Sequence, residues 1–293
     1  MKQRAAICFS GMPRNFKTVF PLFEKYIVDA LGHQNVTCDI FVHTWDNKVQ
    51  YAKYLKDEGS ANECIDMYSP VSYKIETYDV EKIKFLERDS GIDKYLTEIL
   101  FDYNRRDNDI ADWIGGGTLR NNTISLFYGM NQVNNLRIQY EQSNNFVYDI
   151  IIKNRFDNLI YNNLMTLPIL ANTIYSPYGY EPDTRDKLGT INDIFAIGDR
   201  NGMNAYLSLY NNLYNLVTDR YLNKHPRPWH TIGLVKHNLV VNNIDIKRFY
   251  LDHIVSRRLH KYKEYGSVVT GENWNIKIPY TENINSESKI IGY

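Results

Sequence analysis

The chain has 293 residues, enough for one large domain or one domain with an added lobe. Its 34 basic and 34 acidic residues balance, so we expect neither a nucleic-acid partner nor attraction to an anionic membrane. The three cysteines, Cys8, Cys38 and Cys64, lack metal-ligand spacing, and their odd number argues against a disulfide scaffold. These features predict reduced thiols and a cytoplasmic protein.

Short apolar runs alternate with longer amphipathic stretches, a pattern typical of an α/β layer fold with a mainly parallel sheet. The first run, residues 5–9, is too short for a secretion signal or a membrane span, so we expect a strand and no span. Further strands are predicted at 39–45, at 72–76, within 148–157, at 174–176 and at 192–198, and helices at 17–31, 122–140 and 203–221. Residues 82–112 are expected to be helical or irregular. The predicted domain covers residues 1–267, with its C-terminal third helical, and a polar tail covers 268–293.

The most informative segment is the apolar run 150–152 with the residues that follow it. Arg155 and Asp157 stand two positions apart, so in extended chain they face the same side. Ligands of open α/β sheets bind beyond the carboxyl ends of the strands. The segment therefore predicts a ligand site that contains Arg155 and Asp157.

The segment 10–16 follows the first predicted strand. There Ser10, Gly11 and Arg14 could hold the base and diphosphate of a nucleotide through turn amides and the guanidinium group. The segment matches neither the dinucleotide fingerprint nor the P-loop, so an ordinary strand-to-helix turn is the alternative.

Two further predicted strands end in candidate binding residues. His43 and Trp45 share one face at the end of strand 39–45, and Trp45 could stack on a base or sugar. Glu76 closes strand 72–76 and could accept a hydrogen bond from a base or a ribose hydroxyl. The alternatives are core packing for His43 and Trp45, and a solvated strand end for Glu76.

Five motifs together resemble a family of small glycosyltransferases of large DNA viruses, phages and bacterial polysaccharide loci. The motifs are Ser10-Gly11-x-Pro13-Arg14-x-Phe16, Asp39-Ile40-Phe41-x-His43-Thr44-Trp45, Tyr68-x-Pro70, Tyr148-Asp149-x-x-Ile152-Lys153-x-Arg155-x-Asp157 and Asp193-x-Phe195-Ala196-Ile197-Gly198. The resemblance implies a glycosyltransferase-A (GT-A) fold, with a single nucleotide-binding domain around a mixed, mainly parallel sheet flanked by helices. It also implies a nucleoside-diphosphate sugar as donor, and a host-cytoplasmic location if the source is viral.

Within this resemblance, Arg155-x-Asp157 takes the place of the Asp-x-Asp motif that holds a divalent metal. Because Mg²⁺ or Mn²⁺ needs several oxygen ligands, Asp157 would need help, and His230 or His237 is a candidate. Alternatively Arg155 neutralises the diphosphate directly, while Asp157 binds sugar or ribose hydroxyls.

Asp193 is the predicted catalytic base on the acceptor side. In an inverting transfer a carboxylate takes the proton of the acceptor hydroxyl, and in a retaining one Asp193 would orient the sugar. The predicted activity is transfer of a sugar to a hydroxyl of a saccharide or glycan acceptor. The alternatives are a sugar-1-phosphate nucleotidyltransferase and a non-catalytic sugar- or protein-binding module on a degenerate transferase fold.

Overall fold

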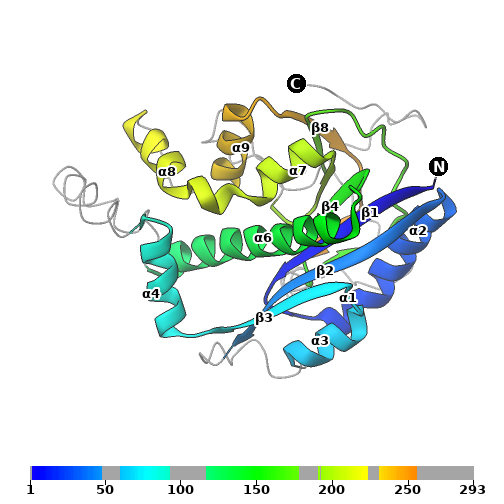
Figure 1. Cartoon of the computed structure of the whole chain (residues 1–293), viewed down its shortest axis with the longest axis horizontal. Helices are drawn as coiled ribbons and strands as arrows, with labels where there is room; N and C mark the ends of the chain where they lie inside the picture. The colour runs from blue at the N-terminus through cyan, green and yellow to red at the C-terminus, as the bar shows by residue number, and fades with distance from the viewer. Residues whose placement is uncertain are drawn as a thin grey trace, which may run out of the picture.

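The structure is a computed structural model that describes residues 2–47, 60–92, 117–177, 191, 193–223 and 231–255. It contains a seven-stranded sheet with helices on both faces (Figure 1). This architecture confirms the predicted α/β class and the mixed, mainly parallel sheet flanked by helices. The predicted tail, 268–293, lies outside the described residues.

The strands of the large sheet stand in the order β3-β2-β1-β4-β7-β6-β8. They are β1 (Gln3–Gly11), β2 (Val36–Asn47), β3 (Ser72–Tyr78), β4 (Ile150–Asn154), β6 (Thr173–Pro177), β7 (Ala196–Gly198) and β8 (Asp245–Phe249). All neighbouring pairs are parallel except those of β7, which is antiparallel to both β4 and β6. A second sheet pairs β5 (Asn158–Ile160) with β9 (His253–Val255) in antiparallel fashion.

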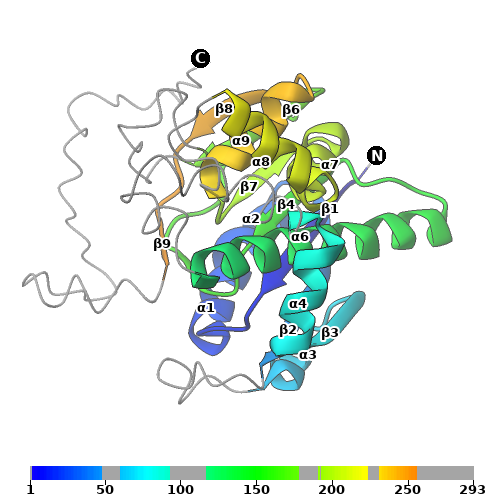
Figure 2. The ribbon, with the colours of Figure 1, turned by 90° about the vertical axis from the view of Figure 1, so that its left-hand side faces the viewer.

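Helices cover both faces of the large sheet. They are α1 (Phe16–Phe23), α2 (Asp29–His33), α3 (Ala61–Tyr68), α4 (Val80–Asp89), α6 (Gly117–Asn144), α7 (Arg200–Leu207), α8 (Leu213–Leu222) and α9 (Thr231–Val241). The first three pack on one face, and α4 and α6 to α9 on the other (Figures 1 and 2). Among the described helices, none is both long enough and apolar enough to cross a membrane.

The central strand β1 shows why the sheet is buried on both sides. Ala5, Ile7 and Phe9 belong to the core beneath α1 and α3, whereas Ala6 and Cys8 belong to the core beneath α6. All five side chains are fully buried. A strand covered on both faces needs a continuous apolar run, and this is the pattern that predicted the parallel sheet.

Three sequence expectations need correction. Of the predicted strand 192–198, residue 192 lies outside the described residues and 193–195 are not strand, so the strand is β7 alone; the main-chain oxygens of Asp193 and Ile194 accept hydrogen bonds from Lys153. The predicted helix 203–221 is divided into α7, a 3₁₀ turn (Leu209–Asn212) and α8. The residues directly after Asp157, where no strand was predicted, form β5, which pairs with a strand almost a hundred residues further along the chain.

Candidate functional site

The order of the strands reverses beside β1. The chain runs from β1 to β2 and β3 on one side, and later returns to β4 on the other side of β1. These four strands are parallel, so their carboxyl ends meet at one edge of the sheet. Open α/β sheets bind ligands at this edge where the strand order reverses. Gly11 at the end of β1 and Asn154 at the end of β4 mark this place.

Arg155 and Asp157, just beyond β4, form an ion pair with two hydrogen bonds. Nε of Arg155 lies 2.8 Å from Oδ1 of Asp157, and Nη2 lies 2.8 Å from Oδ2. The side chains are only 17% and 4% exposed, respectively. Their spacing predicts that both face a ligand, but in this structure they bind each other. Asp157 thereby fixes the plane of the guanidinium group.

A chain of amides holds the turn that carries this pair. Oδ1 of Asn154 accepts from the main-chain N–H of Arg155 at 2.9 Å and from Nδ2 of Asn158 at 2.8 Å. Oδ1 of Asn158 lies 2.9 Å from Nδ1 of His253 on β9. Asn154 and Asn158 are fully buried. Sequence analysis missed these residues, although two asparagines flanking the Arg-x-Asp motif were a visible signal.

The sheet brings Asp193 to the end of β4. In the pairing of β4 with β7, Lys153 stands opposite Ala196, so Asp193 lies just beyond the last residues of β4. Nζ of Lys153 donates to the main-chain oxygen of Asp193, and to that of Ile194 at 3.2 Å. The predicted catalytic base and the predicted donor-binding pair therefore belong to one cluster, with Lys153 beneath them.

The charges of this cluster act on one another. Burial lowers the pKa of Lys153 to about 7, because the ammonium group loses its hydration; Asp193 and Asp157 oppose this shift, and Arg155 adds to it. Sequence analysis placed Lys153 in a motif but gave it no role, since a lysine ordinarily predicts an exposed position.

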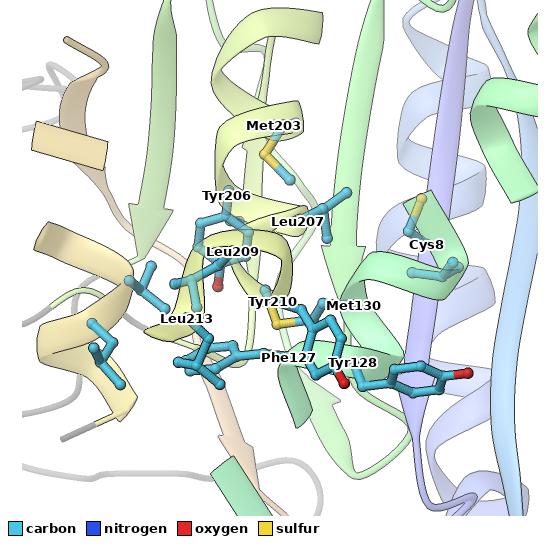
Figure 3. Close-up of a cluster of buried hydrophobic side chains, with 14 of the residues drawn as sticks. Cys8, Phe127, Tyr128, Met130, Met203, Tyr206, Leu207, Leu209, Tyr210 and Leu213 are labelled. Atoms are coloured by element: carbon cyan, nitrogen blue, oxygen red, sulfur yellow. The ribbon is translucent and has the colours of Figure 1, made fainter. Parts of the chain in front are cut away.

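Tyr206, on α7, is fully buried and belongs to the hydrophobic cluster drawn in Figure 3. Burial raises the pKa of its hydroxyl well above the usual value; Asp193 raises it further, and Arg155 opposes this. The hydroxyl therefore stays protonated over the physiological range. Sequence analysis did not single out Tyr206 among the 24 tyrosines of the chain.

Ser10, Gly11 and Arg14 lie at or just beyond the end of β1. Gly11 has φ +114°, and a Cβ atom placed there would meet no atom within 4 Å among the described residues. Its backbone can therefore be approached closely by a ligand. Ser10 instead faces α6, where a Cβ on Gly129 would stand 3.6 Å from that of Ser10. Arg14 is half-buried in the turn before α1.

His43, Trp45 and Glu76 form a separate polar cluster on the α6 face. Oε2 of Glu76 lies 2.9 Å from Nε2 of His43, and its carboxylate also accepts from Lys82 at 2.8 Å and from the Tyr128 hydroxyl at 3.0 Å. Tyr128 extends from α6 toward the β1–β2 side of the sheet (Figure 3). Trp45 is 3% exposed, and its ring packs on His43 and Tyr128. Because Tyr128 stacks on Trp45 and the indole is buried, Trp45 packs in the core and does not present a face to a base.

This cluster lies away from the Arg155 site. Glu76 is on β3, three strands from β4, which corresponds to about 14 Å at the usual strand spacing. Burial lowers the pKa of His43, which keeps the imidazole neutral. Burial by itself raises the pKa of Glu76, but the hydrogen bonds from His43 and Lys82 outweigh it and lower this pKa well below its usual value. The structure thus divides the predicted donor residues between two places.

The predicted metal ligands are Asp157 with His230 or His237, and His237, on α9, lies 2.7 Å from a carboxylate oxygen of Asp219. His230 lies outside the described residues. Among the residues that the structure describes, no group of three or more histidines, cysteines or acidic residues is arranged to hold a metal ion. Asp157 offers one carboxylate, already paired with Arg155, whereas Mg²⁺ and Mn²⁺ need several oxygen ligands. Around Asp157, the described residues therefore do not supply a metal ligand set.

No protein-family model matches the chain, and a comparison with curated proteins finds no significant match.

Proposed function

We propose that this protein is a glycosyltransferase of the GT-A type that moves a sugar from a nucleoside diphosphate to a hydroxyl of a saccharide or glycan acceptor. One observation carries the proposal. Asp193, on a segment that precedes β7, lies in one cluster with the Arg155–Asp157 pair, at the edge of the sheet where α/β folds bind ligands.

Arg155 is the group that we assign to the donor diphosphate. Its planar guanidinium group suits a phosphate, to which it can donate two parallel hydrogen bonds. Asp157 holds the guanidinium plane before the donor arrives, so less freedom is lost on binding. The open space at Gly11, on the neighbouring strand, gives the nucleotide room to approach the backbone.

Asp193 is the group that we assign to the acceptor. In an inverting transfer, its carboxylate takes the proton of the acceptor hydroxyl as that oxygen attacks the anomeric carbon. The bond from the anomeric carbon to the phosphate oxygen breaks, and its electron pair leaves with the nucleoside diphosphate. Arg155 stabilises the negative charge that grows on this leaving group. In a retaining transfer, Asp193 would orient the acceptor instead.

A divalent cation is not required by this assignment. Mg²⁺ or Mn²⁺ would supply Lewis-acid stabilisation of the diphosphate, with Asp157 as one ligand. Because the described residues offer no complete ligand set, no step of the proposal depends on the metal. The binding screen therefore includes samples with and without Mn²⁺.

The first experiment is a thermal-shift screen with nucleoside diphosphates and nucleotide sugars. A ligand present at a hundredfold excess over its Kd stabilises the fold by about 2.7 kcal/mol. That corresponds to roughly 5 °C or more in Tm for a protein of this size class. We expect one nucleotide sugar to give this shift, and Arg155→Lys to weaken its binding about tenfold or more because the planar fork is lost.

The chain offers a matched control at the opposite edge of the sheet. Arg4 and Asp39 also form an Arg–Asp pair, with Nη2 2.8 Å from Oδ2, but they lie near the amino ends of β1 and β2. Arg4→Lys should leave nucleotide binding unchanged. Equal effects of Arg4→Lys and Arg155→Lys would contradict the assignment of Arg155.

Transfer separates an enzyme from a binding module. We expect Asp193→Asn to keep donor affinity and to lower turnover by about 100-fold or more, since a general base contributes about 10²–10⁴. Donor binding by wild type without transfer or hydrolysis under any acceptor would favour a non-catalytic module. The absence of any nucleotide-induced shift would contradict the donor site itself.

A further inference from the structure

Lys153 is a buried charged residue at the candidate site that takes no part in the sugar transfer proposed above. Its side chain is fully buried at the penultimate position of β4. Its register neighbours are Cys8 on β1 and Ala196 on β7, neither of which carries a charge that could pair with an ammonium group. Within the described parts of the chain, no carboxylate lies within 4 Å of Nζ.

A buried lysine without a carboxylate partner is costly, so its contacts indicate why the position holds one. Nζ donates to two successive main-chain oxygens, those of Asp193 and Ile194. These oxygens belong to the bend that precedes β7. They lie outside the residue pairs that join β4 to β7. One side-chain nitrogen with several N–H bonds satisfies both, which a single hydroxyl could not do.

We propose that Lys153 is a positioning residue, which holds the main chain at Asp193 and Ile194 against the end of β4 and so sets where the Asp193 carboxylate stands relative to the Arg155–Asp157 pair. This inference rests on the function proposed above. Lys153 itself lies beneath the cluster and touches neither donor nor acceptor in this assignment. It acts through the position of Asp193.

Lys153 can form both hydrogen bonds to the Asp193 segment whether its amine is charged or neutral. An ammonium group has three N–H bonds, and a neutral amine keeps two, which equals the number of oxygens that Lys153 contacts. With the pKa of Lys153 lowered to about 7, both forms are present near neutral pH. Loss of the proton therefore leaves the Asp193 segment in place, whereas loss of the nitrogen releases it.

The test is Lys153→Met, which removes the nitrogen and keeps an unbranched apolar side chain. We expect faster amide hydrogen exchange in the peptide that covers residues 193–198, measured by mass spectrometry. We also expect a fall in kcat of about 100-fold, because a displacement of about 1 Å at a reacting group has an effect of that size, with donor Kd changed less than threefold. A lysine that only stabilised the fold would not separate kcat from Kd in this way.

Two further variants keep the test decisive. Ile151→Val alters a buried neighbour on the same face of β4 and should change neither the exchange of 193–198 nor kcat. Lys153→Gln keeps two N–H donors on a shorter, uncharged side chain, and serves if the Met variant does not fold. We expect its exchange and kcat to lie between those of wild type and the values expected for Lys153→Met.

The outcomes separate this inference from the function on which it rests. Unchanged amide exchange at 193–198 in the folded Lys153 variants would show that Lys153 does not hold this segment, whatever the activity of the variants. Faster exchange with unchanged kcat would overturn the positioning role. A wild-type protein that binds no nucleotide sugar would overturn the proposed function, while the exchange data would still decide whether Lys153 holds the segment.

Discussion

Arg155 and Asp157 bind each other through two parallel hydrogen bonds of 2.8 Å, although their spacing predicted that both face a ligand. The pair lies in the turn between β4 and β5, where the chain bends and the two side chains meet. Asp157 is thus the counterion of Arg155 in this structure. In the donor site that we propose, the pair supplies an oriented cation.

The backbone conformation of Gly11, at the end of β1, can be tested by substitution. Its φ of +114° is strained for any residue with a Cβ, while the space around that Cβ is open among the described residues. Gly11→Ala should therefore lower the free energy of unfolding by about 1–3 kcal/mol through backbone strain alone. Urea denaturation measures this loss.

Gly32 is the matched control for this prediction. A Cβ at Gly32 also meets no described atom within 4 Å, but Gly32 lies within the helix α2. Gly32→Ala should raise stability by about 0.5–1 kcal/mol, because alanine favours the helix. Equal effects of the two substitutions would show that the conformation of Gly11 is not the cause.

A buried ion pair within α6 is expected to be important for stability. Nη1 of Arg137 lies 2.8 Å from Oε2 of Glu141, and both side chains are at most 1% exposed. Glu141 also accepts a hydrogen bond from the main-chain N–H of Tyr148 at 3.0 Å. Glu141→Gln leaves the charge of Arg137 uncompensated, so we expect a loss of about 3–5 kcal/mol in urea denaturation.

An exposed pair provides the comparison for Glu141. Glu81 and Lys84 on α4 lie 2.9 Å apart, with side chains 77% and 59% exposed. Glu81→Gln should cost less than about 0.5 kcal/mol, since water screens the pair. Similar losses for Glu141→Gln and Glu81→Gln would contradict the role of burial.

The lowered pKa of Lys153 predicts a rise of stability with pH. Between about pH 7 and the ordinary lysine value of 10.5, the unfolded chain keeps a proton that the folded chain has released. The free energy of unfolding therefore rises with pH in this window, by at most about 1.4 kcal/mol per pH unit from this group, and is independent of it below about pH 6.

Lys153→Met isolates this contribution. We expect the stability of wild type to increase relative to that of the variant between pH 7 and pH 9, as measured by urea denaturation at each pH. A constant difference across this range would indicate that Lys153 keeps an ordinary pKa in the fold.

The lowered pKa of Glu76 predicts an acid-dependent loss. A carboxyl group with a depressed pKa stabilises the fold above its unfolded pKa, near 4.5, and this contribution is lost as the pH falls below that value. The stability advantage of wild type over Glu76→Gln should therefore shrink from pH 5 to pH 3 in denaturation experiments. An advantage that stays constant over this range would contradict the network around Glu76.

Much of the fold could be predicted from the sequence, because it depends on local pattern. The strands at residues 5–9, 39–45 and 72–76 lie within β1, β2 and β3, and their apolar runs predicted a covered parallel sheet. The helix predicted at 122–140 lies within α6. Parts that depend on distant partners were missed, such as β5, which pairs with β9.

The residues of the candidate site also divide into those that the sequence could predict and those that depend on distant contacts. Position along the chain was sufficient to place Arg155 and Asp157 just beyond β4, but the turn that brings their side chains together was not predicted. The same reasoning could not tell that His43 and Trp45 are covered, because the helix that covers them, α6, begins about 70 residues later in the chain. Residue type gave no reason to expect a buried position for Lys153, because lysines are usually exposed; in the structure its side chain is fully buried.

By itself, the sequence determined the α/β class, the strands β1, β2 and β3, and the position of Arg155 and Asp157 just beyond β4, since each follows from local pattern along the chain. The tertiary structure alone decided that Asp193 joins this pair and that Lys153 lies beneath them. The physical reason is the antiparallel pairing of β4 with β7, which joins segments about forty residues apart and buries the lysine between them.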